Sequence, residues 1–140
     1  MPLAKLPYPG FLDDLKSAHL LRVPGEGGVP FRVAGYGSTF DWPPPVITPG
    51  DGQRRFADSD YLGLLPAYLH TQQNFATGNG GTGFGDSGGP VFWIEPNGTP
   101  LLVALTSWGD AKRVASGFYW RVDLPETLDF INGVLASQPE

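Results

Sequence analysis

The sequence contains no cysteine, and among its 140 residues are only two histidines and one methionine. Without cysteine the chain can form neither a disulfide framework nor a thiolate metal site. It also lacks a long apolar run at its start, where Pro2, Pro7 and Pro9 interrupt residues 1–11. This segment is therefore predicted to be neither a signal peptide nor a membrane span. Basic residues are few, and a formal net charge of −5 argues against nucleic acid or an anionic membrane as a partner.

Glycine and proline, by contrast, are abundant, with 20 and 15 residues respectively. Such a composition borders on that of disordered chains unless bulky apolar residues offset it. Here 41% of the residues are hydrophobic and 13% are aromatic. We therefore expect one turn-rich, mostly β domain over residues 1–140, with a modest core.

Short apolar runs between turn residues predict the strands. They lie at Phe31–Ala34, Tyr61–Leu65, Val91–Ile94, Leu101–Thr106 and Phe118–Val122. Asn97-Gly98 favours a type I′ turn, which would make residues 90–107 a hairpin. The same pair opens an N-glycosylation pattern, but the turn explains it better. The spacing of the strands is typical of a meander or a barrel.

Two other segments are predicted from proline and from apolar spacing. Residues 38–52 contain three consecutive prolines, which donate no backbone hydrogen bonds, so we expect an irregular surface loop. After Pro125 the apolar residues have helical spacing, and Asp123 is available as the N-cap. These apolar residues are Leu128, Ile131, Val134 and Leu135. Helical spacing is seen only in this C-terminal segment.

The segment that indicates chemistry is residues 80–90, in which Ser87 lies among glycines. Glycines allow the backbone to approach another molecule closely, as a nucleophilic serine and its oxyanion-binding N–H groups require. We expect those donors to be the amides of Gly85 and Ser87. The pattern Gly85-x-Ser87-x-Gly89 also fits the nucleophile elbow of α/β-hydrolases. An elbow serine, however, opens a helix, whereas residues 90–94 are β-rich.

The hexapeptide from Gly85 to Pro90 resembles the nucleophile signature of the chymotrypsin/trypsin family of serine endopeptidases. Three further segments resemble that family in the same order along the chain: residues 33–37, 107–109 and 117–122. The resemblance implies the second six-stranded antiparallel barrel of the double-barrel fold, with a short C-terminal helix and without the N-terminal barrel.

The same resemblance implies roles for individual residues. Ser87 would be the nucleophile for peptide-bond hydrolysis through an acyl-enzyme, with the amides of Gly85 and Ser87 as the oxyanion hole. Asp86 would hold the loop by pairing with an N-terminal ammonium formed on activation. The implied substrate-binding residues are Gly81, Ser107, Trp108, Gly109 and Gly117. No cofactor or metal is implied. The partners would be a peptide or protein substrate and the missing N-terminal barrel, in a secreted or extracytoplasmic protein.

The sequence departs from the family in its catalytic partners. A catalytic serine needs a histidine base and a carboxylate that orients it, and the family takes both from its first barrel. Neither His19 nor His70, which follows a predicted strand at Tyr68-Leu69, stands at the family's position. We expect both to be solvent-facing or hydrogen-bonded histidines without a catalytic role, so that this chain alone is inactive. The alternative is a non-catalytic, protease-like module that binds peptides.

Three further expectations concern the pocket, the loop and the surface. Gly81 stands where members that cleave after Lys or Arg have Asp, which favours a neutral, apolar pocket, although nearby Asp110 could alter it. Gly83 stands where many members start a disulfide, so packing or hydrogen bonds must stiffen the loop. A barrel without its partner also exposes the apolar surface that would contact it, which predicts self-association or binding of that partner.

Overall fold

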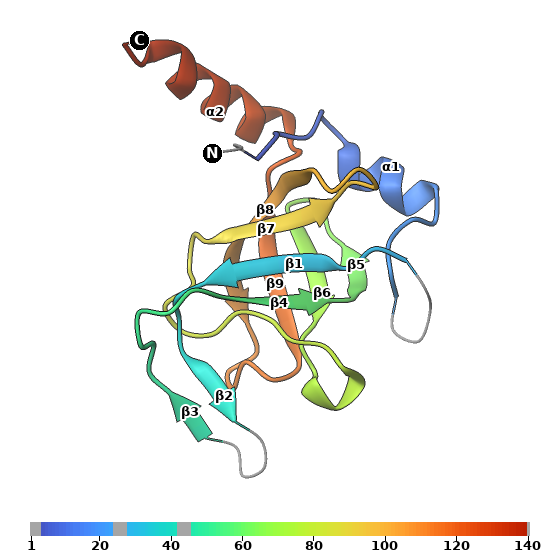
Figure 1. The fold of residues 1–140 in the computed structure, drawn as a ribbon. Coiled ribbons are helices and arrows are strands. Elements are labelled where there is room, and N and C mark those ends of the chain that lie inside the picture. Colours follow the sequence, from blue (N-terminus) through green and yellow to red (C-terminus); the bar gives the residue numbers. More distant parts are fainter. Residues whose placement is uncertain (1–3, 24–27, 42–45, 140) are drawn as a thin grey trace.

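The computed structural model describes residues 4–23, 28–41 and 46–139. Seven strands form one antiparallel sheet in the order β4-β1-β7-β8-β9-β6-β5, and the sheet curls into a half-barrel (Figure 1). This confirms a mostly β fold with a short C-terminal helix. The strands are β1 (Phe31–Gly35), β4 (Arg55–Ser59), β5 (Tyr61–Leu64), β6 (Tyr68–Gln72), β7 (Pro90–Ile94), β8 (Pro100–Gly109) and β9 (Ser116–Arg121).

The curl of the sheet follows from the connection between its two edges. β4 and β5 are the outermost strands of the sheet, yet only Asp60 separates them along the chain. The sheet must therefore bend until its edges come close together. Alternate residues of the strands point inward and form the core. Those with almost no exposed surface are Phe31, Val33, Leu69, Val91, Val103 and Tyr119.

The five strands predicted from apolar runs and the further one at Tyr68-Leu69 are all present, but the turn of the predicted hairpin differs. Gly98 N–H donates to the Glu95 carbonyl (2.8 Å), and Glu95 N–H donates to the Thr99 carbonyl (2.9 Å). Gly98 has a φ of 86°, whereas Asn97 is not among the residues with positive φ. This is a type I turn followed by a bulged glycine, so the type I′ prediction is wrong. The turn is centred on Pro96-Asn97 rather than on Asn97-Gly98, because the ring of Pro96 fixes φ near −65°, which suits the first central position of a type I turn.

The expectation of an irregular loop over residues 38–52 is wrong in part. Thr39–Asp41 (β2) and Val46–Thr48 (β3) pair as a small antiparallel ribbon, with Phe40 opposite Ile47. The prolines at 43–45 lie outside the described residues. The paired residues are mostly β-branched or aromatic, which favours strands on both sides of the prolines.

A helix near the N-terminus was not expected. α1 (Phe11–Ser17) follows Gly10, whose φ of 79° ends the preceding turn, and it buries Phe11, Leu12 and Leu15 against the sheet. Seven residues make only two turns, too few for apolar periodicity to distinguish the helix from a loop. A still shorter 3-10 helix, η1 (Phe75–Thr77), lies before the nucleophile loop.

The predicted C-terminal helix is α2 (Pro125–Ser137), but its predicted N-cap is wrong. Leu124 precedes the helix without a side-chain cap. The carboxylate of Asp123 is fully buried and accepts hydrogen bonds from Arg121 and from Leu12 N–H (2.9 Å) instead. α2 extends away from the sheet (Figure 1). Neither helix of the described residues is long and apolar enough to cross a membrane.

Candidate functional site

The nucleophile loop, residues 83–90, is held in an extended bend by its glycines. Gly85 has a φ of 96° and Gly88 a φ of 78°, a conformation that residues with a side chain rarely adopt. Gly88 N–H donates to the carbonyl of Thr106 in β8 (2.9 Å), which fixes the loop to the sheet. Ser87 stands between the two glycines, and its side chain is exposed to solvent.

The carboxylate of Asp86 holds this loop against the end of β1. It accepts hydrogen bonds from Gly37 N–H (2.7 Å) and Gly83 N–H (2.8 Å). A Cβ atom added to Gly35 would lie only 2.0 Å from Oδ1 of Asp86, so the approach depends on glycine there. Asp86 therefore stabilises the loop through backbone N–H groups, where the family resemblance implies an N-terminal ammonium.

Further contacts stiffen the loop without a disulfide. Phe84 N–H donates to Oγ of Ser38 (2.9 Å), and Ser38 N–H donates to the Phe84 carbonyl (2.7 Å). A Cβ atom on Gly83 would lie 2.4 Å from the Ser38 carbonyl oxygen, so the two backbones are in close contact. Hydrogen bonds and close packing thus act at the position where the family often has a cystine.

The expected oxyanion donors are not engaged elsewhere. Within the described part of the chain, the N–H groups of Gly85 and Ser87 have no hydrogen-bond acceptor. Unengaged backbone donors next to a serine can stabilise negative charge that develops on a carbonyl oxygen.

No histidine lies beside Ser87. The serine lines a shallow depression of about 310 Å³ that also includes Tyr36 and Arg54 but neither histidine of the chain. His19 is exposed at the end of α1, as expected. His70 lies on β6, which β8 and β9 separate from β7. It differs from the expectation because its Nε2 is buried and has no partner among the described residues.

A free strand edge begins next to the nucleophile loop. β7 pairs with β8 only as far as Leu105, whereas β9 continues along the opposite side of β8 to Gly109. Among the residues that the structure describes, no strand therefore pairs with one edge of the predicted substrate-binding residues 107–109. Ser107 is the extra residue of a bulge, a feature that often redirects strands near active sites. Because Thr106 holds the loop, this edge starts directly beside Ser87.

The two glycines expected at the specificity pocket lie against polar side chains. A Cβ atom on Gly81 would lie 1.8 Å from Nε2 of Gln73, and one on Gly117 would lie 2.4 Å from the Tyr119 hydroxyl. Gln73 is 4% exposed, and its Nε2 donates to the Thr82 carbonyl (3.3 Å) and to the Tyr119 hydroxyl (3.4 Å). Burial raises the pKa of Tyr119, which keeps its phenol neutral. These polar groups stand where the sequence favours an apolar pocket.

Arg113 stands between the free edge and the nucleophile loop. Its Nη1 lies 2.7 Å from the position of a Cβ atom on Gly109, and its guanidinium carbon is 5.0 Å from the centre of the Phe84 ring. Arg113 adopts a φ of 58°, which is unusual for a residue with a side chain. It also lines a cleft of about 270 Å³ together with Gln73 and residues 81–84.

Asp110 organises the loop that carries Arg113. Its carboxylate accepts hydrogen bonds from the N–H groups of Val114 (3.1 Å), Ala115 (2.9 Å) and Ser116 (3.0 Å). Burial opposes the charge, but these bonds outweigh it and lower the pKa of Asp110. The carboxylate of Asp110 therefore accepts its hydrogen bonds from N–H groups of its own loop.

No protein-family model matches this chain, and no curated protein matches it either. The roles considered below rest on the residues and their geometry.

An aromatic stack forms the outer face beside the free edge. The rings of Trp108 and Phe118 stack at 3.9 Å, and those of Phe118 and His70 at 4.2 Å. Trp108 is 47% exposed, as a residue in contact with a substrate would be. Burial in this stack lowers the pKa of His70. The stack gives the edge a rigid apolar wall.

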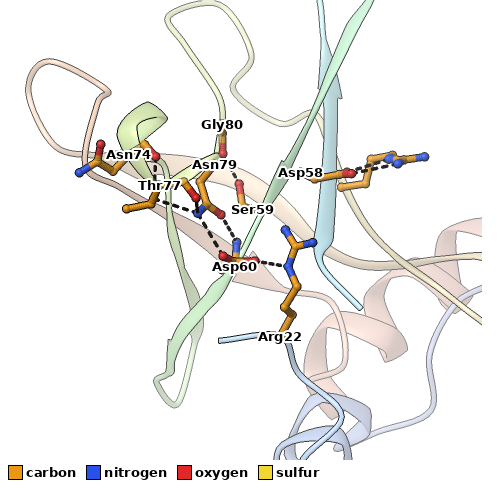
Figure 2. Close-up of polar contacts among 9 residues, drawn as sticks. Arg22, Asp58, Ser59, Asp60, Asn74, Thr77, Asn79 and Gly80 are labelled. Atoms are coloured by element: carbon orange, nitrogen blue, oxygen red, sulfur yellow. Dashed lines mark hydrogen bonds and ion pairs between the residues drawn. The ribbon is translucent and has the colours of Figure 1, made fainter. Parts of the chain in front are cut away.

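A buried polar network supports the segment that leads into the loop. Figure 2 shows Asn79 between residues 74–77 and Asp60, the residue that joins β4 to β5. Asp60 N–H donates to Oδ1 of Asn79 (2.7 Å), whose Nδ2 donates back to the Asp60 carboxylate (3.1 Å). Arg22 pairs with the same carboxylate. Ser59 also donates to the Gly80 carbonyl, so residues 79–80 are fixed to the sheet.

Two residues at this site, Gln73 and Arg113, were missed by the sequence analysis. Gln73 follows β6, and only the pairing of β6 with β9 brings it to Gly81 and Tyr119. Arg113 stands four residues after Gly109 in a loop with no turn signature. The available signal was a Lys112-Arg113 pair in a chain with few cations, next to the expected substrate-binding strand.

Proposed function

We propose that this chain is the nucleophile-bearing barrel of a chymotrypsin-like serine endopeptidase. The observation that supports this most strongly is the free edge of residues 107–109 directly beside Ser87. The curl of the sheet is also consistent with it: if β4 and β5 are counted as one strand bent at Asp60, the sheet has the six strands expected for the family's second barrel.

The reaction follows from this arrangement. An extended substrate adds as a strand along residues 107–109, which brings its scissile carbonyl to Ser87. Oγ of Ser87 attacks the carbonyl carbon and gives its proton to a base, while the N–H groups of Gly85 and Ser87 stabilise the oxyanion. The base then protonates the leaving amine, and water hydrolyses the acyl-enzyme.

The base comes from outside these residues, because neither His19 nor His70 lines the depression at Ser87. By itself the chain is therefore inactive, and a separate barrel would supply the histidine and the aspartate. The family resemblance further suggests an extracytoplasmic protein without a cofactor.

Chemical rescue tests this proposal. The chain is incubated with a fluorophosphonate probe, with and without a high concentration of imidazole as the missing base, and adducts are read by intact mass. We expect no adduct without imidazole and an adduct that grows with imidazole concentration. Ser87→Ala should abolish it. An adduct without imidazole would show that His19 or His70 acts as the base; no adduct under any condition would contradict the nucleophile assignment.

The absence of a histidine beside Ser87 also favours a second candidate, a non-catalytic module that binds an extended peptide at the same edge. It differs from the first in two measurable respects. Peptide affinity would be the same in Ser87→Ala as in the unchanged chain, and imidazole would produce no adduct at Ser87.

A further inference from the structure

The cations of this acidic chain are unevenly distributed. Of nine Lys and Arg residues, the described ion pairs engage five: Lys5, Arg22, Arg32, Arg55 and Arg121. Lys16, Arg54, Lys112 and Arg113 have no carboxylate partner in the described part of the chain. Three of these four line the hollows on either side of the nucleophile loop, Arg54 beside Ser87 and the other two in the cleft beside residues 81–84. The Asp86 carboxylate also lines both hollows, so the three cations leave a local excess of positive charge in a chain that is acidic as a whole.

Arg113 is the unpaired cation whose position suggests contact with a ligand. Its Nε is buried and has no hydrogen-bond partner among the described residues. Arg113 as a whole is half-buried and lines the cleft, so its guanidinium can donate to a carboxylate bound there. The side chain spans from Gly109, at the end of the free edge, to Phe84 in the nucleophile loop. A substrate side chain that leaves the edge at Gly109 would therefore meet the guanidinium.

We propose that Arg113 recognises an acidic side chain, glutamate or aspartate, at the substrate position that precedes the scissile bond. This rests on the proposed function above, because it takes residues 107–109 as the substrate strand. Gln73 occupies the space at Gly81 and closes the base of the pocket, so recognition takes place near its mouth, where Arg113 lies. Arginine suits this role, since its planar fork binds carboxylates with two hydrogen bonds.

Asp110 orders the loop that carries Arg113. It binds three N–H groups of its own loop, and its carbonyl accepts a hydrogen bond from Arg113 N–H (3.0 Å). The loop is therefore ordered before any ligand binds, and the guanidinium loses little freedom on contact.

Peptide binding to the full chain tests the inference without requiring turnover. Four fluorescein-labelled octapeptides differ only at one central position, which is Glu, Gln, Leu or Lys, and Kd is measured by fluorescence anisotropy. We expect the Glu peptide to bind about tenfold or more tightly than the Gln peptide, the range of a charge-assisted hydrogen bond. The preference should fall with rising salt.

Three matched variants each remove one unpaired cation: Arg113→Asn, Lys112→Asn and Arg54→Asn. Asparagine tolerates the positive φ of position 113, and circular dichroism checks that each variant is folded. Only Arg113→Asn should abolish the preference for Glu, and Arg113→Lys should restore part of it. A preference that survives in Arg113→Asn would overturn the proposal, as would one lost equally in all three variants.

The remaining outcomes separate the inference from the function on which it rests. Equal affinity for all four peptides would overturn recognition by Arg113 and leave the endopeptidase proposal intact. Tighter binding of the Gln peptide, through a hydrogen bond to Oε1 of Gln73, would do the same. Tighter binding of Leu after Arg113→Asn would show that the arginine only obstructs the pocket, which also overturns it. No binding of any peptide would overturn both proposals.

Discussion

Asp86 and the glycine opposite it determine where the nucleophile loop lies. A methyl group at Gly35 would overlap the Asp86 carboxylate, with Cβ 2.0 Å from Oδ1. We expect Gly35→Ala to displace Asp86 from the N–H groups of Gly37 and Gly83, and to lower the free energy of unfolding by about 1–3 kcal/mol, as overpacking typically does. Urea unfolding measures the loss, and the NMR shifts of the Gly37 and Gly83 amides report the displacement.

The matched control is Gly133→Ala in α2, where an added Cβ meets nothing within 4 Å. There alanine should stabilise the helix by up to about 1 kcal/mol, because glycine is the weaker helix former. If both variants changed stability in the same direction, the contact of Gly35 with Asp86 would not be the cause.

His70 should make stability depend on pH. Burial lowers its pKa in the folded chain, so the unfolded chain, with an ordinary value of about 6.5, binds the proton more readily. The contribution of neutral His70 is therefore fully present above that value and is lost as pH falls toward the folded-state pKa. Between pH 7 and pH 5.5 the urea midpoint should decline less in His70→Phe, which keeps an aromatic ring on Phe118, than in the unchanged chain. His19→Gln, at an exposed site, should decline as the unchanged chain does. An equal decline in His70→Phe would exclude His70 as the source.

The residues that could be predicted from sequence are those whose chemistry is local. Ser87 and the left-handed Gly85 and Gly88 lie in one glycine-rich segment, so their pattern alone indicated a sharp, exposed loop. Gln73 and Arg113 could not be found in this way. They reach Gly81 and Gly109 only through strand pairing and a loop closed by Asp110, and neither carries a local signature.

At the scale of elements, α1 is attached to the sheet by a buried charge network. Arg121 is 4% exposed and pairs with Asp123 (2.9 Å) and Asp13 (2.5 Å), while Leu12 N–H donates to Asp123. Although burial disfavours its charge, these bonds raise the pKa of Arg121. Asp123→Ala would leave a buried cation with one exposed carboxylate partner, Asp13, and the Leu65 carbonyl. We expect it to lower the free energy of unfolding by about 3–5 kcal/mol, measured with urea.

Two further variants, Asp123→Asn and Asp51→Ala, serve as controls for Asp123→Ala. Asp123→Asn keeps a hydrogen-bond acceptor and should cost less, so it gives a folded variant even if Asp123→Ala does not fold. Asp51→Ala breaks the exposed pair with Arg55 and should leave the urea midpoint unchanged, because solvent screens that pair. An Asp123→Ala midpoint equal to that of Asp51→Ala would contradict the proposed anchoring of α1.

Strands and the C-terminal helix were predictable where apolar residues recur with a clear period. The prediction was wrong where a distant contact or a single ring decided the conformation. Pro96 determined the type of the turn at residues 95–98. The carboxylate of Asp123, predicted to cap α2, accepts hydrogen bonds from Arg121 and from Leu12 N–H instead. α1 is stable only because the sheet buries its short apolar face.

At the scale of the whole molecule, α2 is the element least covered by the rest of the chain. Leu128 is its only buried residue, whereas Phe130, Val134 and Leu135 are 72%, 42% and 58% exposed. Phe130 and Val134 lie at i and i+4, which places them on one face, and Leu135 lies about 100° further round the helix than Val134. Figure 1 shows the helix extending beyond the sheet. Such a face is expected to bind either a second copy or the separate barrel that the proposed function requires.

We expect the chain to bind a hydrophobic dye and to form species larger than its 15.0 kDa monomer in light scattering. Phe130→Gln with Leu135→Gln should reduce both without changing the urea midpoint, because neither side chain is buried. Phe56→Gln, which removes an aromatic ring that is 66% exposed on edge strand β4, controls for association through that edge. If only the change on β4 restored the monomer, association would occur through the open sheet edge rather than through α2. A dye-free monomer of the unchanged chain would contradict the expectation altogether, since the apolar face of α2 would then need no partner.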